Sequence, residues 1–193
     1  MQEELLKTLP RLKDWWNIQN DRMDLDTNFI YKCNTFDEVI DNLKKLNMEQ
    51  AQKKATLTYT LRRWYNFHTA MFVESIFKKH YRVTGVENNK DKEKDFYIDG
   101  ISFDHKNLIL PKKFKQIYNF NAEKEIIHWL YDNQSQQWRK HNKNRIFLWF
   151  NKVEDKVKFD VIEIIINNFL SNRIERIRLW DYLHSKILFI WTI

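Results

Sequence analysis

The sequence predicts a mixed α/β fold (α/β in the broad sense, α+β in its mixed form), with a central mixed β-sheet flanked by helices. Three observations support this class. An Asp-Gly pair between alternating apolar residues indicates a β-hairpin at 94–106, a long stretch with helical spacing precedes it at 56–80, and helix and strand patterns follow it to residue 150. The chain has 193 residues, a length typical of one domain.

We therefore expect a single domain over 1–193, divided into a helical N-terminal subregion at 1–55, a core at 56–150 and a C-terminal extension of the core at 151–193. In the subregion, Thr35-Phe36-Asp37-Glu38 has the pattern of a capping box that opens a helix. Residues 5–20 complete this subregion. No repeat or Gly/Ser/Pro-rich linker divides the chain.

The stretch 56–80 predicts one long helix, because its apolar residues recur every three or four positions. Glu74 lies on a partly different face, with Phe67, Ala70, Met71 and Phe77 as its helical neighbours. A carboxylate in such surroundings is either an ordinary residue at the boundary with solvent or part of a site. His68, in contrast, is expected to be a core histidine with a satisfied hydrogen bond.

The hairpin follows a short strand at 81–86 and a charged loop at 87–94, and its register follows by counting from the turn. If Asp99 and Gly100 form a type I′ turn, Phe96 pairs with Phe103 and Asp95 lies opposite Asp104. Side chains alternate across a strand. One face is then apolar and carries Phe96, Ile98, Ile101, Phe103 and His105, while the other carries Asp95, Tyr97, Ser102, Asp104 and Lys106.

After the hairpin, Leu108-Ile109-Leu110 extends the strand until Pro111 ends it. Asn121 is a candidate N-cap for the next helix, with Glu123 and Glu125 in its first turn. The apolar run 145–150 predicts a buried strand. In the C-terminal extension, we expect a helix at 160–170 and a strand at 186–191.

The polar face of the hairpin predicts a cation site. Like charges placed opposite each other on paired strands are destabilising, so Asp95 facing Asp104 calls for compensation. Mg²⁺ prefers carboxylate oxygens and retains waters for chemistry. Lys106 points to the same side, where its charge suits a scissile phosphate or an attacking water.

Two other interpretations of these residues stay open. The hairpin face could be a solvated surface with incidental charges. The acid-x-Lys spacing is also weak by itself, since Glu154-Asp155-Lys156 has it too. That second match lies in the polar run 151–156, which has no apolar alternation, so we interpret it as a turn.

The residues Asp95 and Asp104-His105-Lys106 resemble the PD-(D/E)xK nuclease superfamily, whose members have a restriction-endonuclease-like fold. The order helix, strand, hairpin, helix, strand over 56–150 is similar to the core of that family. Lys94 replaces the usual Pro, and Asp104 replaces the commoner Glu. The resemblance implies that Asp95 and Asp104 bind metal together with the backbone carbonyl of His105, that Lys106 assists catalysis, and that Glu74 completes the site.

The net charge of +7 favours a polyanionic partner. Basic residues concentrate on both sides of the helix expected after the hairpin, where they suit contacts to phosphates: Lys112, Lys113, Arg139, Lys140, Lys143 and Arg145. Each cluster could instead be a solvated loop. Gln134 or Gln137 could orient water or phosphate, although an exposed polar face is the simpler interpretation.

Several function classes lack their usual sequence support. With only Gly85 and Gly100, the chain has no Walker A loop and no G-x-G-x-x-G fingerprint. A single cysteine, Cys33, excludes an intrachain disulfide framework and a cysteine-based zinc site. The longest apolar runs are far shorter than the roughly 20 residues of a membrane helix. We expect no membrane association, no secretory signal and a cytoplasmic location.

The sequence therefore predicts a Mg²⁺-dependent deoxyribonuclease, with Mn²⁺ as a substitute metal and double-stranded DNA as the substrate. Its catalytic residues would be Asp95, Asp104, Lys106 and Glu74. Restriction, repair and mobile-element roles all fit, and two copies could act as a homodimer on the two strands. The main alternative is a catalytically silent DNA-binding module on the same fold. A nuclease that uses His141 and Asn142 is a weaker alternative.

Overall fold

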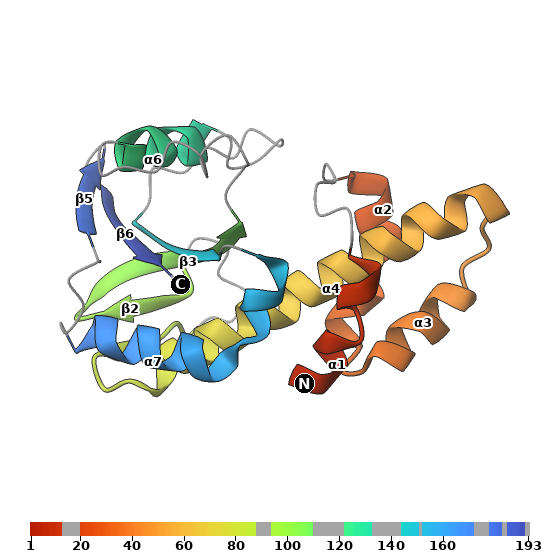
Figure 1. Ribbon diagram of the computed structural model, residues 1–193, viewed down its shortest axis with the longest axis horizontal. Coiled ribbons are helices and arrows are strands. Elements are labelled where there is room, and N and C mark those ends of the chain that lie inside the picture. The colour runs from red at the N-terminus through yellow and green to blue at the C-terminus, as the bar shows by residue number, and fades with distance from the viewer. Residues whose placement is uncertain are drawn as a thin grey trace.

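The computed structural model describes residues 1–12, 20–87, 94–109, 122–132, 144–150, 152–171, 178–182 and 185–191. Within these residues the chain is a mixed α/β protein built around one mixed sheet, as predicted. Figure 1 shows the sheet and its covering helices at one end of the molecule and the N-terminal helices at the other. The long helix α4 (Gln50–Lys79) runs between the two ends.

The N-terminal subregion is helical, as expected, but its helices are short. They are α1 (Gln2–Leu6), η1 (Leu9–Arg11), α2 (Asp21–Asp26), η2 (Asn28–Lys32) and α3 (Phe36–Lys44). The predicted capping box is present at α3, where Thr35 accepts from the Glu38 backbone N–H and the Glu38 carboxylate accepts from the backbone N–H of Thr35. Within the stretch 5–20, which was expected to belong to this subregion, the structure describes the end of α1 and η1, and residues 13–19 lie outside the described residues.

Helix α4 begins six residues earlier than predicted and packs with both ends of the molecule. Near its middle, the Trp64 indole donates to the Cys33 carbonyl at 2.8 Å, and the His68 ring lies 2.9 Å from the same oxygen. His68 is thus a satisfied histidine, as expected. Towards the C-terminal end of α4, Phe77 stacks on Phe96 of the sheet with 4.7 Å between ring centroids.

The sheet has the strand order β1-β2-β3-β4-β6-β5. The strands are β1 (Val83–Gly85), β2 (Phe96–Ile98), β3 (Ile101–Ile109), β4 (Arg145–Phe150), β5 (Arg178–Tyr182) and β6 (Ser185–Trp191). The first three strands are antiparallel, β3, β4 and β6 run parallel to one another, and β5 is antiparallel to β6. Strand β5 was not predicted, because its sequence, Arg178-Leu179-Trp180-Asp181-Tyr182, does not alternate between polar and apolar residues.

The predicted hairpin register is confirmed. Phe96 pairs with Phe103, Tyr97 with Ser102 and Ile98 with Ile101. Asp99 and Gly100 have φ of 49° and 80°, the left-handed backbone that a type I′ turn requires at both positions. Arg82 donates to both carboxylate oxygens of Asp99, and the Asp99 backbone N–H donates to the Arg82 carbonyl, so the turn is also held from outside.

Helices cover both faces of the sheet (Figure 1). Helix α6 (Ala122–Asp132) connects β3 to β4 on one face, where Tyr131 contacts Phe147 edge to face. Helix α7 (Phe159–Leu170), close to the predicted 160–170, lies on the other face together with α4. Phe72 of α4 stacks on Phe159 with 3.5 Å between centroids. Buried residues from the N-terminal helices, α4, the sheet and α7 form one continuous core cluster.

The described helices do not include one with both the length and the apolar composition needed to cross a bilayer. Within the same residues, the buried Cys33 is a free thiol.

Substituting each of the two glycines of the chain tests the assigned hairpin turn. Gly100→Ala should lower the free energy of unfolding by about 1 kcal/mol, because alanine is strained at a φ of 80°. The measurement is urea denaturation followed by circular dichroism. Gly85→Ala is the matched control, since a Cβ there would meet only the Lys78 side chain at an ordinary 3.6 Å. Equal losses in the two variants would contradict the assigned turn.

Candidate functional site

Asp95 is fixed to β3 by hydrogen bonds on both its backbone and its side chain. It lies one residue before β2, and its backbone N–H donates to the Phe103 carbonyl at 2.8 Å. One carboxylate oxygen, Oδ2, accepts from the backbone N–H of His105 at 2.8 Å and from the Nδ1 of the His105 ring at 2.7 Å. Because Asp95 precedes the strand, its carboxylate is not confined to one face by the pleat, and it reaches the apolar-face residue His105.

These contacts hold the Asp95 carboxylate in its ionised form. Burial raises the pKa of Asp95, but the hydrogen bonds from the His105 ring and backbone, together with the charges of His105 and Lys106, outweigh that effect and leave the pKa below its ordinary value. An anionic oxygen is therefore present at neutral pH, and 27% of the side-chain surface is accessible to a ligand.

His105 is buried on the apolar face, as the register predicts. Its ring centroid lies 6.0 Å from that of Phe96 and 6.5 Å from that of Phe77. The ring contacts Asp95 through Nδ1, which leaves the other ring nitrogen, Nε2, for a further partner. Only 6% of His105 is exposed, and its Nε2 is a buried atom without a hydrogen-bond partner.

Glu74, Asp95 and His105 form the metal-ligand cluster that the described residues contain. A carboxylate oxygen of each acid and a ring nitrogen of His105 lie within 4.8 Å of one another. Glu74 comes from α4, where it also forms an ion pair with Lys78, and 19% of its side chain is exposed. Two carboxylates and an imidazole are a donor set that divalent cations accept, and Mn²⁺ tolerates both ligand types.

Asp104 lies beside this cluster and has cationic partners of its own. The Lys106 ammonium is 2.7 Å from Oδ1, and the Arg145 guanidinium Nε is 3.5 Å from Oδ2. Lys106 also lowers the pKa of Asp95, so its charge acts on both aspartates. About half of the Lys106 side chain is exposed, whereas only 11% of that of Asp104 is. The structure thus brings Glu74 and Asp95 together with His105, whereas Asp104 is paired with Lys106 and Arg145 and is not one of the clustered ligands, so the predicted contact of Asp95 with Asp104 is replaced by that of Asp95 with His105.

Of the predicted nucleic-acid contacts, only Arg145 lies within the described residues. It is the first residue of β4, is 6% exposed, and places its guanidinium 5.5 Å from the centre of the Tyr131 ring. Its guanidinium is thus directed at Asp104 and is shielded from solvent. The remaining basic residues fall outside the described ranges: Lys112, Lys113, Arg139, Lys140 and Lys143. Gln134, Gln137, His141 and Asn142 also do.

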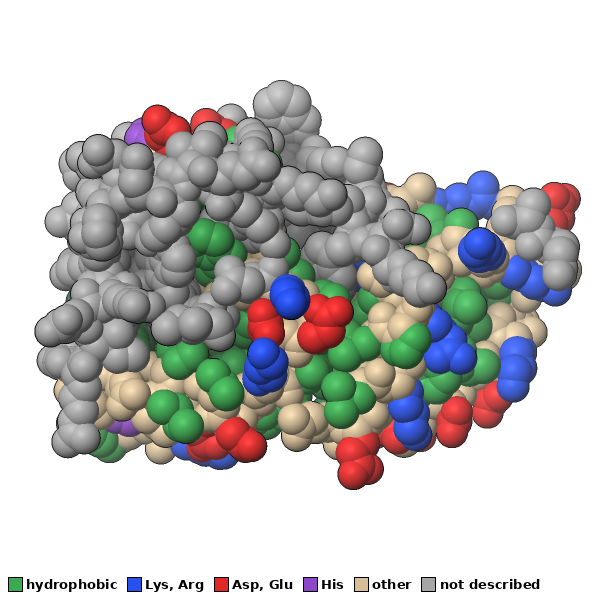
Figure 2. Space-filling view, viewed as in Figure 1, with side chains coloured by type: hydrophobic (Ala, Val, Ile, Leu, Met, Phe, Trp, Pro, Cys, Tyr) green, Lys and Arg blue, Asp and Glu red, His purple; other side chains and the backbone are tan. Residues whose placement is uncertain are grey.

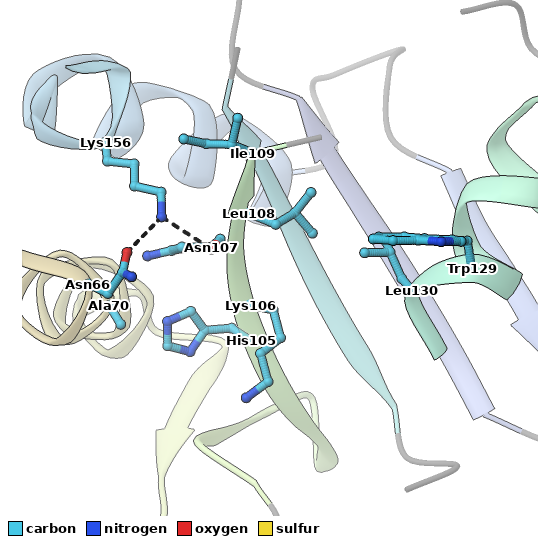
Figure 3. A pocket seen from close by; sticks show the side chains of 10 residues that line it. All are labelled: Asn66, Ala70, His105, Lys106, Asn107, Leu108, Ile109, Trp129, Leu130 and Lys156. Atoms are coloured by element: carbon cyan, nitrogen blue, oxygen red, sulfur yellow. Dashed lines mark hydrogen bonds between the residues drawn. The ribbon is translucent and has the colours of Figure 1, made fainter. Parts of the chain in front are cut away.

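A cavity of about 470 Å³ adjoins the site. It lies along the second half of β3, beyond the residues that pair with β2, and Figure 3 shows α4 on one side of it and α6 on the other. The lining residues come from α4, β3, α6 and the segment after β4: Asn66, Ala70, His105, Lys106, Asn107, Leu108, Ile109, Trp129, Leu130 and Lys156. His105 and Lys106 belong both to the cavity and to the site.

Lys156 is a cavity residue that the sequence did not reveal. The run 151–156, interpreted as a turn, contains the start of a 3-10 helix, η3 (Val153–Val157), and Lys156 is only 2% exposed. Its ammonium lies 3.0 Å from Asn66 Oδ1 and 3.4 Å from the Asn107 carbonyl (Figure 3). Burial lowers the pKa of Lys156 to about 7. The spacing of Val153 and Val157 was the one available signal of an inward-facing helical turn.

The His105 ring was the second omission. The resemblance assigns the backbone carbonyl of His105 to the metal, and that role stays a prediction. The side chain, however, is what lies next to Asp95 and Glu74. A histidine placed on an apolar face directly after a charged strand residue was the signal that a partner carboxylate should be sought.

Comparison of the chain with protein-family models, with curated proteins and with solved structures gave no match.

A cation at the cluster should stabilise the folded protein. In a thermal melt, Mn²⁺ in large excess should raise the melting temperature of the wild type, with a gain of about 2.7 kcal/mol at 100 times the dissociation constant. Glu74→Gln should reduce this shift by removing one anionic ligand. Glu163→Gln is the matched control, because Glu163 also pairs with a neighbouring lysine, Lys79, but lies away from the cluster. A Mn²⁺ shift that is the same in all three proteins would rule the cluster out.

Proposed function

We propose that this protein is a divalent-metal-dependent deoxyribonuclease of the PD-(D/E)xK type, with a restriction-endonuclease-like core, that hydrolyses phosphodiester bonds in duplex DNA as an endonuclease. The observation that carries the proposal is the arrangement at the hairpin. Asp95 lies against His105 at the end of the paired stretch of the hairpin, α4 brings Glu74 to Asp95 and His105, and the neighbouring residues of β3 are Asp104 and Lys106.

The order of the elements supports this proposal. From α4 onwards, the chain forms a helix, three antiparallel strands, a helix and a strand parallel to β3, which is the element order that the resemblance implies. The sheet places the end of the antiparallel hairpin beside the first parallel pair, β3 and β4. The acidic residues lie at this transition, where β2 no longer covers the edge of β3.

The donor set fits a hard divalent cation. Glu74 and Asp95 would hold it, with the His105 ring adjacent and Asp104 as the further carboxylate that the resemblance assigns to the metal. Mg²⁺, or Mn²⁺ in its place, would lower the pKa of a bound water and offset negative charge on the phosphate.

The chain's own side chains have distinct tasks in this scheme. Lys106, half exposed at the site, would supply positive charge to the scissile phosphate as negative charge develops there. His105 holds Asp95 in position through two hydrogen bonds to one oxygen. Arg145, buried beside Asp104, would orient that carboxylate while Lys106 turns to substrate.

Duplex DNA is the proposed substrate because of the net charge of +7. On the face seen in Figure 2, blue and red groups alternate over the N-terminal helices, and no broad basic patch forms among the described residues there. Among the described residues, the proposed phosphate contact is Lys106, and the basic segments that flank α6 in the sequence are the further candidates.

One observation favours the second candidate, a catalytically silent DNA-binding module. Asp104 already has two cationic partners, Lys106 and Arg145, and so has no electrostatic need of a metal. Such a protein would shift DNA in a gel with an affinity that falls as salt rises, and it would leave the DNA intact.

The cleavage assay uses supercoiled plasmid with Mg²⁺ or Mn²⁺. The wild type should nick or linearise it, and Asp104→Asn and Lys106→Met should each lose about 100-fold or more of the rate, because each removes charge that acts in the transition state. Cleavage should stop in EDTA.

The control for this assay is Asp160→Asn, at an exposed acid in the first turn of α7, which should cut like the wild type. Cleavage that persists in both site variants would refute the assignment of residues. A gel shift without any cleavage, in either metal, would establish the silent module instead.

A further inference from the structure

Another cavity, of about 300 Å³, lies in the N-terminal subregion between α3 and the first turns of α4. Figure 1 shows these two helices side by side, at the end of the molecule away from the sheet. The connection between the helices closes the cavity from a third side, because Leu46 and Met48 belong to its lining. The cavity shares no residue with the metal-ligand cluster, so what it binds is independent of the proposed cleavage.

The walls of this cavity are aliphatic. Its apolar lining residues are Ile40, Leu43, Leu46, Met48 and Leu57. Leu43 is buried, whereas the other four are only half-buried. Removing such apolar surface from water is favourable, and the unbranched Met48 side chain adapts readily to the shape of a ligand. These five side chains offer neither an aromatic ring nor a strong hydrogen-bonding group, which favours a flexible aliphatic chain over a planar or polar ligand.

Two lysines complete the lining, Lys44 from α3 and Lys53 from α4. Both are exposed, as expected for a side chain that lays its methylene stem along apolar surface and keeps its ammonium in water. Lys44 is already paired with Asp41 at 2.8 Å, whereas Lys53 has no ion pair within the described part of the chain. Lys53 stands one turn from Leu57 on α4, so its charge lies at the edge of the apolar wall.

An aliphatic carboxylate matches this combination of walls and charge. Its chain removes the half-buried side chains from water, and its head group places a negative charge beside Lys53. The volume lies at the lower end of the range of small-ligand pockets, about 300–1,000 Å³. A partner helix would instead need a groove with anchor positions over several turns, which is more than the apolar lining of this cavity provides.

We propose that the cavity between α3 and α4 binds a medium-chain fatty acid, with its aliphatic chain against the five apolar residues and its carboxylate at Lys53. The activity at the hairpin is not needed for this binding. The ligand is recognised by two properties only, an unbranched apolar chain and a single negative charge at its end.

The test is calorimetric titration of the full chain with hexanoate, octanoate and decanoate, at concentrations at which these lipids are monomeric. The affinity of the wild type should rise about fourfold for each methylene that the cavity takes up. Decylammonium is the matched probe, since it has the same apolar chain and the opposite charge. It should bind more weakly than decanoate, because Lys44 and Lys53 repel it.

Three variants test the lining. Met48→Gln places an amide in the apolar wall with little change in length, and it should weaken decanoate binding about tenfold. Lys53→Met removes the charge and keeps an apolar side chain, so it should weaken decanoate binding about threefold without weakening that of decylammonium. Lys45→Met is the matched control, because Lys45 is exposed next to Lys44 but does not line the cavity. It should bind decanoate like the wild type.

Thermal melts of each variant establish that it is folded. The proposal is overturned if decanoate does not bind to the wild type, if it binds as tightly to folded Met48→Gln, or if decylammonium binds as tightly as decanoate. An amphipathic peptide of Leu and Glu that binds more tightly than decanoate would overturn it in favour of a protein partner. A wild-type dimer that Met48→Gln dissociates would overturn it in favour of a second copy of the chain.

Discussion

The register of β2 on β3 is the constraint on which the candidate site depends. It is set by the left-handed backbone at Asp99 and Gly100, and it places Asp95 next to the backbone of His105. A slip of one residue would turn every side chain of the hairpin to the opposite face and separate the carboxylates from Lys106. The arrangement of charges therefore follows from a two-residue turn far from the charges themselves.

Each acid of the site has a partner among the neighbouring side chains. Asp95 is held by His105, Glu74 by Lys78, and Asp104 by Lys106 together with Arg145. At Asp95, the contacts with His105 outweigh the effect of burial and lower the pKa of the carboxyl group. A cation or a phosphate that binds at the site must compete with these existing contacts. If it displaces them, the nuclease interpretation holds, and if the contacts persist, the silent DNA-binding module does.

The sequence predicted those parts of the molecule that depend on local patterns. The hairpin, the capping box at Thr35, the long helix and the buried strand at 145–150 all follow from spacing and turn chemistry, and the structure confirms them. The His105 contact was missed because a residue just outside a strand does not obey the pleat. Lys156 was missed because its burial depends on how η3 packs against α4, which is a tertiary effect without a local pattern.

The central claim is that the hairpin and α4 form a divalent-metal centre. A crystal structure of the protein soaked in Mn²⁺, with data collected at the manganese absorption edge, tests it most directly. The account predicts an anomalous peak within about 2–2.5 Å of carboxylate oxygens of Glu74 and Asp95. No peak there, with the contacts from Asp95 to His105 and from Asp104 to Lys106 intact, would contradict it.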